Sequence, residues 1–217
     1  MNPTLPTTLS FLFFALTTYF PLAFTQVNKL VQDTDGNPLG PGYKYYISQT
    51  TTSGQEGGGL MLGYSGTGQS CALTVLQEFC EDHDGLPVRF NVTNGGFAIF
   101  EDEFNIEIEF VNKPKCAQSS KWMVVENFDN FHTKWITIGS LEDHGGNTKF
   151  IDSVFKIKKQ GKGYKFVFYS EQTTYDVKRF NDVNGRRLAA NGFASSRYHP
   201  FEVEFVNAEI YRRRSVV

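Results

Sequence analysis

The side chains that could catalyse a reaction or bind a metal ion lie scattered along this 217-residue chain. The histidines, none of them at a metal-ligand spacing from a cysteine or beside a nucleophile motif, are His83, His132, His144 and His199. Two pairs of acids alternate along apolar runs, namely Glu107 with Glu109 and Glu202 with Glu204. Alternate residues of a strand share a face, so each pair could mimic an acid catalyst, but a solvent-facing strand surface is the simpler interpretation. We therefore predict that the protein is not an enzyme and needs neither metal nor cofactor.

The N-terminal segment has the composition of a secretory signal. Residues 1–25 contain no charged side chain, and the stretch from Leu9 to Leu16 is almost entirely apolar. This stretch is too short for a membrane span, which needs about 20 apolar residues. Small residues at Ala23 and Thr25 place the cleavage site just before Gln26. We predict a signal peptide over 1–25 and a single mature domain over 26–217, secreted to the extracellular space or the vacuole, with no membrane partner.

Such a signal would carry the three cysteines, Cys71, Cys80 and Cys116, into an oxidising compartment where disulfides form. An odd number leaves one thiol over, and counting alone does not select among the three pairs. The same compartment attaches N-linked glycans, and Asn91-Val92-Thr93 is a sequon with an allowed middle residue. We predict that Asn91 is a glycosylation site on an exposed loop.

The charge of the chain argues against a nucleic-acid partner. The formal net charge is −2 at pH 7, and no basic footprint stands out along the sequence. Three consecutive arginines occupy 212–214, close to the C-terminus, and their simplest interpretation is a solvated tail.

Short runs that alternate apolar and polar residues recur along the chain and predict strands. The clearest covers 106–110, in which Ile106, Ile108 and Phe110 point one way and the glutamates the other. Further runs cover 73–76, 122–125, 135–138, 154–158, 164–169 and 201–205. Turn residues separate them, and Gln160 to Gly163 has the form of a hairpin connection. No amphipathic helix interrupts the series, so we predict an all-β barrel or sandwich.

One segment, VQDTDGNPLGPGYKYYI over 31–47, combines a tight turn with the start of a strand. The glycine of Asp35-Gly36-Asn37-Pro38 permits a positive φ, and Tyr45 to Ile47 begins the strand. The segment resembles the N-terminal signature of the plant Kunitz inhibitors of the soybean trypsin inhibitor type. The positions that match it at the family's spacing are Val31, Asp33, Asp35, Gly36, Asn37, Leu39, Tyr45 and Ile47. A tight turn followed by a strand in an unrelated protein would match only three or four of these positions.

The resemblance extends along the mature chain and implies a β-trefoil, with twelve strands in three pseudo-equivalent units, six forming a barrel and six capping it. Cys71 and Cys116 resemble the first cysteine pair of the family, so the resemblance implies the disulfide Cys71–Cys116. Tyr169 stands where the family's second pair would have a cysteine. Cys80 matches no family cysteine, and we expect an unpaired thiol that is either free or available to another chain.

Inhibitors of this family present a convex loop to the protease cleft as a substrate would. Counting back from the 106–110 strand places the corresponding bond near Gly96-Phe97, in a reactive loop of Asn94, Gly95, Gly96 and Phe97. Trypsin-directed members have Arg or Lys before this bond, whereas this loop has no basic residue. The aspartate in the specificity pocket of trypsin would then be buried without a partner, which is strongly unfavourable. Pro41 occupies the position of an asparagine that often braces the loop, and it has no side-chain donor.

We therefore predict a secreted Kunitz-type serine protease inhibitor of non-tryptic or altered specificity, with a cysteine protease as the alternative target. An alternative inhibitory loop contains Lys158, Lys159 and Lys162, although a solvated hairpin tip is the simpler interpretation. The alternative function is a trefoil that binds another partner, or serves in storage or defence, without inhibiting a protease. We expect a monomer, with a disulfide-linked dimer through Cys80 as the alternative.

Overall fold

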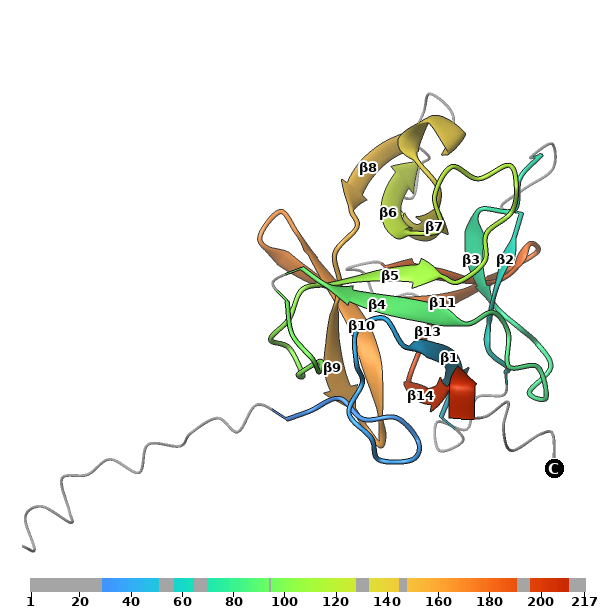
Figure 1. Cartoon of the computed structure of the whole chain (residues 1–217). Helices are drawn as coiled ribbons and strands as arrows, with labels where there is room; N and C mark the ends of the chain where they lie inside the picture. Colours follow the sequence, from blue (N-terminus) through green and yellow to red (C-terminus); the bar gives the residue numbers. More distant parts are fainter. Residues whose placement is uncertain are drawn as a thin grey trace, which may run out of the picture.

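The computed structural model describes residues 29–50, 57–64, 70–93, 95–127, 133–144, 148–190 and 196–210. The predicted signal peptide, His132 and the arginines at 212–214 lie outside these ranges. The described chain is almost entirely β-structure (Figure 1). Its strands are β1 (Lys44–Gln49), β2 (Leu60–Gly63), β3 (Thr74–Gln77), β4 (Val88–Val92), β5 (Ile106–Phe110), β6 (Trp122–Asn127), β7 (Lys134–Ile138), β8 (Thr148–Asp152), β9 (Lys156–Gln160), β10 (Gly163–Ser170), β11 (Thr173–Asp182), β12 (Gly185–Ala190), β13 (Tyr198–Pro200) and β14 (Val203–Asn207), and a 3₁₀ helix, η2 (Leu141–His144), follows β7. No helix in these ranges is long and apolar enough to cross a membrane.

Six strands form a closed barrel. They pair in the order β5, β4, β1, β14, β10 and β9, all antiparallel. An isolated bridge between Ile106, at the start of β5, and Phe155, just before β9, closes the ring. These two residues exchange backbone hydrogen bonds of 2.8 Å in both directions. Closure leaves no open sheet edge within the barrel.

Three hairpins cap one end of the barrel, namely β2 with β3, β6 with β7 and β11 with β12. Their inner strands β3, β7 and β12 pair with one another, so the hairpins meet around a common axis. Six barrel strands and six cap strands make the predicted β-trefoil. Two further strands bring the described total to fourteen, because β8 adds to the free edge of β6 and β13 to that of β11.

The alternation of side chains in these strands builds an aromatic core. In β5 the residues Ile106, Ile108 and Phe110 are buried and the two glutamates between them are partly exposed, as the pattern predicts. Trp122 lies at the centre of the aromatic cluster and is fully buried. Its ring centroid lies 5.8 Å from those of Phe110 and Phe166 and 6.0 Å from that of Phe155. Such contacts between buried rings contribute stability beyond the burial of apolar area.

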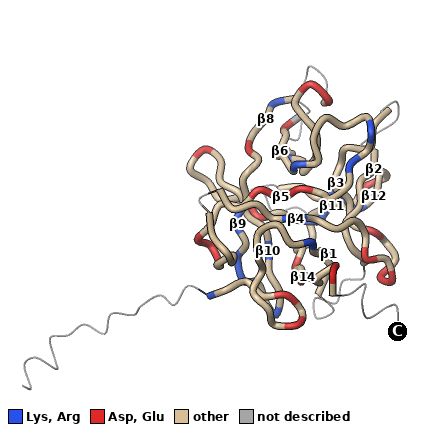
Figure 2. Tube along the Cα trace, in the orientation of Figure 1, with Lys and Arg blue, Asp and Glu red and all other residues tan. Residues whose placement is uncertain are grey.

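Most charged side chains lie outside this core, although Asp33, Arg179 and Arg187 are buried. Figure 2 shows Lys and Arg interspersed with Asp and Glu along the described strands and loops. Glu204 of β14 is half-buried, and burial raises the pKa of its carboxyl group.

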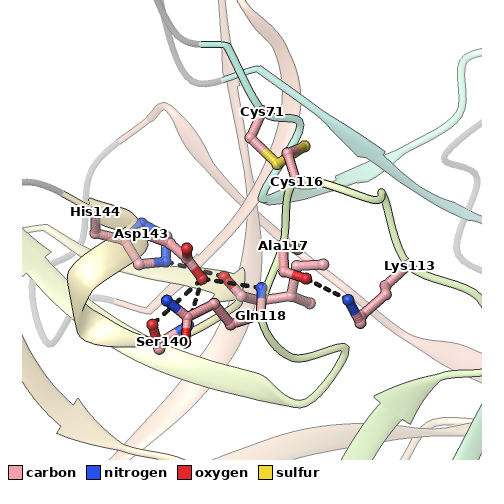
Figure 3. The surroundings of a disulfide bond; sticks show 9 residues. Cys71, Lys113, Cys116, Ala117, Gln118, Ser140, Asp143 and His144 are labelled. Atoms are coloured by element: carbon pink, nitrogen blue, oxygen red, sulfur yellow. Dashed lines mark hydrogen bonds between the residues drawn. A yellow bond between two sulfur atoms is a disulfide. The ribbon is translucent and has the colours of Figure 1, made fainter.

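The structure contains the disulfide Cys71–Cys116 that the resemblance implies, and Cys80 is free and exposed. Near the disulfide, the carboxylate of Asp143 accepts hydrogen bonds from the backbone of Ser140 (2.8 Å) and Gln118 (3.3 Å) (Figure 3). Partial burial disfavours the charged carboxylate, but these hydrogen bonds outweigh it and lower the pKa of Asp143. The neighbouring His144 is bonded to the carbonyl of Ile138 at 2.9 Å, and burial lowers the pKa of its ring. Both side chains thus tie η2 to its surroundings.

Loss of the disulfide should be one of the costlier changes to stability. Replacing Cys71 and Cys116 together by serine should lower the free energy of unfolding by about 4 kcal/mol, because the bond closes a 45-residue loop in the unfolded chain. Urea denaturation of the purified protein measures this difference. Cys80→Ser is the matched control and should change the free energy by less than about 0.5 kcal/mol. An unchanged midpoint in the double variant would contradict the prediction.

Candidate functional site

The connection between β4 and β5 presents an exposed apolar side chain beside a buried anchor. Phe97 is 91% exposed, whereas Ala98 is 4% exposed and Ile99 is fully buried. The chain therefore passes from solvent into the core within two residues. Thr93 closes the base of the connection, since its backbone N–H (3.2 Å) and its hydroxyl (3.0 Å) both donate to the carbonyl of Asn105. Asn94 lies outside the described residues.

The segment after Phe97 is held by the N-terminal part of the described chain. The N–H of Ile99 donates to the carbonyl of Leu39 at 2.8 Å, and the carbonyl of Ile99 accepts from Val31 at 2.9 Å. Leu39 in turn donates to the carbonyl of Val31 at 2.8 Å. All three side chains are fully buried. Residues 31 and 39 thus form a platform that fixes the backbone of Ile99.

The turn between Val31 and Leu39 gives this platform its shape. One oxygen of the buried Asp33 carboxylate accepts the backbone N–H groups of Asp35 (3.0 Å) and Asn37 (2.8 Å). Gly36 has φ +82°, a conformation that side chains disfavour. The sequence signature over 31–47 therefore builds the support of the exposed loop.

Comparisons with known proteins agree with this architecture. Residues 31–207 match the family model Kunitz_legume, described as trypsin and protease inhibitor. The chain belongs to the plant Kunitz inhibitor family. A Kunitz-type trypsin inhibitor-like 2 protein of Pisum sativum is 40% identical over 96% of this chain and 95% of its own length. The subtilisin inhibitor CLSI-II of Canavalia lineata is 34% identical over 84% of this chain and 94% of its own length.

The solved structures support the same assignment. A Kunitz-type trypsin inhibitor from Cicer arietinum superposes with a TM-score of 0.72 and 37% identity, covering 83% of this chain and 99% of its own. The β-trefoil prediction is thereby confirmed. Members of the Kunitz family are protease inhibitors and not enzymes.

In this Kunitz chain the two glycines before Phe97 make few contacts. Gly95 has φ +75°, and a Cβ placed there would meet no atom within 4 Å. A Cβ on Gly96 would meet only the carbonyl oxygen of Ala98, at 3.6 Å, which is ordinary contact. The N–H of Gly95 donates to the carbonyl of Val92 over a long 3.4 Å. The loop is thus more firmly held after Phe97 than before it.

Gly40 and the ring of Tyr43 lie next to the backbone of the Kunitz loop at Phe97. A Cβ on Gly40 would stand 3.5 Å from the carbonyl oxygen of Phe97, so this glycine lies directly behind it. The N–H of Gly40 donates to the hydroxyl of Tyr45 at 3.0 Å. Pro41 has neither an N–H nor a polar side chain, so it cannot donate a bracing hydrogen bond to the loop.

Two of the three lysines predicted for the alternative inhibitory loop, which lies in the basic hairpin of β9 and β10, make internal contacts through their ammonium groups. The ammonium of Lys158 lies 3.0 Å from a carboxylate oxygen of Asp102. Lys159 donates to the carbonyl of Lys162 at 2.7 Å and lies 4.3 Å above the ring of Tyr164. Lys162 is exposed, and its backbone N–H donates to Glu202 at 3.0 Å. Sequence reasoning did not connect Lys158 with Asp102, because 56 positions separate them.

The remaining predicted positions lie on the surface. Asn91 is exposed, as predicted, but it lies in strand β4 opposite Glu107 of β5 and not on a loop. Cys80 lies in the connection between β3 and β4, where its carbonyl accepts the N–H of His83 at 3.2 Å. In the part of the chain that the structure describes, no group of three or more His, Cys, Asp or Glu residues could hold a metal ion.

Proposed function

We propose that this Kunitz inhibitor acts on a serine protease through the segment around Gly96-Phe97, with a specificity other than that of trypsin. The observation that carries the proposal is the 91% exposure of Phe97 two residues before the fully buried, hydrogen-bonded Ile99. A side chain presented in this way can enter a protease pocket while the backbone that follows it stays in place. The family's function as protease inhibitors supplies the partner class.

The mechanism follows from the support of the loop. The segment lies in the protease cleft as an extended strand, and its scissile bond reaches the catalytic serine as that of a substrate does. Because the platform at Val31 and Leu39 already holds Ile99, binding orders little additional backbone. After cleavage the disulfide and the barrel keep both new ends close, so the bond can reseal rather than separate.

The residues of the loop favour a small or an aromatic-preferring pocket. Neither Gly96 nor Phe97 can pair with the aspartate of the trypsin pocket, and a buried charge without a partner is costly. Gly96 suits a protease with a shallow pocket, and Phe97 suits one that accepts aromatic rings. The Canavalia relative is named as a subtilisin inhibitor, so non-tryptic activity occurs within the family.

The proposal also covers the processing, location and oligomeric state of the protein. We propose a signal peptide over 1–25, secretion, a glycan on the exposed Asn91, and a monomer with Cys80 as a free thiol. A dimer joined through Cys80 and inhibition of a cysteine protease remain the alternatives, as does a trefoil without inhibitory activity.

Titration of the purified mature protein against trypsin, chymotrypsin, elastase, subtilisin and papain tests the proposal. We expect stoichiometric inhibition of chymotrypsin, elastase or subtilisin, and no effect on trypsin at micromolar excess. Phe97→Ala should raise the inhibition constant at least about 30-fold if the ring fills the pocket. Inhibition of papain alone would replace the serine class with the cysteine class. No inhibition of any of the five would contradict the proposal in favour of a binding or storage trefoil.

The basic hairpin is tested separately with Lys159 and Lys162, because Lys158 contacts the β4–β5 connection. Strong inhibition of trypsin that disappears in the Lys159→Gln, Lys162→Gln double variant would move the inhibitory site to the hairpin.

A further inference from the structure

Asp102 occupies the corner at which the β4–β5 connection changes its backbone partner. Just before it, the N–H of Glu101 donates to the carbonyl of Lys29 at 2.8 Å, so the chain still pairs with the N-terminal segment. At the corner, the N–H of Asp102 donates to the carbonyl of Ile157 in β9, also at 2.8 Å. Asp102 has φ +57°, in the left-handed region that few residues other than glycine adopt.

Two lysines of β9 hold this corner. The ammonium of Lys156 donates to the carbonyl of Asp102 at 2.9 Å and lies 4.0 Å from one of its carboxylate oxygens. The ammonium of Lys158 lies 3.0 Å from the other oxygen. Both cations lie near the ring of Tyr169, at 5.2 and 5.8 Å from its centroid. In Figure 2, basic positions on β9 lie close to acidic positions of a neighbouring connection.

The electrostatics agree with the geometry. Burial disfavours the charged form of Lys158, but the hydrogen bonds to Asp102 and Tyr169 outweigh it and raise the pKa of its ammonium. Lys156 and Lys158 are each partly shielded from solvent, with 22% and 27% of their side chains exposed. A single exposed ion pair contributes little, whereas several charges in one network with a backbone carbonyl contribute more.

Residues 99–102 are thus fastened on two sides. The platform at Val31 and Leu39 holds Ile99, and β9 holds Asp102. Backbone strain at a non-glycine residue persists only where the surroundings enforce it, and such residues concentrate at functional sites. Pro41 cannot donate a hydrogen bond to the loop. Other contacts must therefore keep the exposed Phe97 in one position.

We propose that Asp102, with Lys156 and Lys158, is the positioning residue of the inhibitory loop. The carboxylate does not touch the protease. It fixes the corner after Ile99 and thereby holds the Gly96-Phe97 segment in its binding conformation. This inference rests on the proposed function, and it assigns to Lys158 a supporting role in place of the direct inhibitory role considered for the hairpin.

Asp102→Asn and Lys158→Gln test the inference without requiring a known target. Amide hydrogen exchange of the full mature protein should become about three- to tenfold faster at Ile99 and Glu101 in both variants, since both lose the ion pair between Lys158 and Asp102. The double variant should exchange no faster than the faster single variant, because both changes remove the same contact. The melting temperature should fall by no more than about 3 °C.

Asp176→Asn is the matched control, because Asp176 forms a comparable ion pair with Lys165 at 2.8 Å on β10 and β11. It should leave exchange at Ile99 and Glu101 unchanged. With whichever protease the titration identifies, Asp102→Asn should raise the inhibition constant and the rate of loop cleavage by a similar factor, and Asp176→Asn should not.

The proposed inhibitory function and the positioning role of Asp102 can be contradicted independently of each other. If the wild-type protein inhibits no protease, the proposed function fails, and exchange at Ile99 still decides whether Asp102 positions the loop. Unchanged exchange in Asp102→Asn, or an equal change in the Asp176→Asn control, overturns the inference.

Discussion

Gly96→Arg is expected to convert the protein into an inhibitor of trypsin. The new guanidinium would pair with the aspartate of the trypsin pocket, which the wild-type loop leaves without a partner. The backbone can accept the change, because the positive φ belongs to Gly95 and a Cβ on Gly96 meets only the carbonyl oxygen of Ala98 at 3.6 Å. Residues that fill a specificity pocket dominate the affinity of such interfaces. The inhibition constant for trypsin should therefore fall at least about 100-fold relative to the wild type.

Gly96→Gln is the matched control, since it adds a side chain of similar reach without charge and should give little inhibition of trypsin. Gly95→Arg places the same charge one residue earlier, at φ +75°, and should be a poorer inhibitor than Gly96→Arg. If Gly96→Arg inhibits trypsin no better than the wild type, the segment around Gly96-Phe97 is not the contact loop.

Trp122→Ala is expected to cause the largest single loss of stability, lowering the free energy of unfolding by about 3–5 kcal/mol. The indole is fully buried and contacts three aromatic rings from β5, β10 and the segment before β9. Its removal leaves a cavity among these three rings, and rigid strands collapse into it only partly. Urea denaturation and thermal melting measure the loss, which should lower the melting temperature by roughly 10 °C.

Trp122→Phe separates the effect of ring volume on stability from the effect of the buried indole N–H. Trp122 Nε1 is buried and finds no hydrogen-bond partner among the described residues. Phenylalanine removes this unsatisfied donor, so it should cost clearly less than alanine. Phe150→Ala, at a ring that is 45% exposed on β8, should cost less than about 1 kcal/mol. A cost for Trp122→Ala no greater than that for Phe150→Ala would contradict the central role of the indole.

Most strands could be predicted from local pattern. The alternation over 106–110 places three apolar residues on the core side, and β5 covers that range. The hairpin at 160–163 is also present, with Gln160 opposite Gly163. Two predicted runs, 154–158 and 201–205, begin two residues before their strands, since β9 starts at Lys156 and β14 at Val203. Phe155 and Phe201, which lie just before these two strands, are buried nevertheless. The core therefore includes residues outside the hydrogen-bonded strands.

The strand β11 was not predicted because its sequence lacks a clean alternation and its turn lacks the usual residues. Hairpins with two positive φ angles normally use Asn-Gly or Asp-Gly. Here Glu171 and Gln172 take those conformations, at φ +50° and +64°. Pairing with β10, β12 and β13 supplies the hydrogen bonds that offset this local disadvantage.

The sequence by itself determined an all-β chain and a loop around Gly96 without a basic residue, because turn residues and alternation act within a few positions along the chain. The family and the trefoil were implied by the resemblance of the signature over 31–47, which is also a local feature. Tertiary structure decided what supports that loop. The carbonyl of Leu39 meets Ile99, and Lys158 meets Asp102, only after the barrel has closed. Contacts between residues some 60 positions apart depend on the whole arrangement of strands, so no local pattern around Gly96 and Phe97 could reveal them.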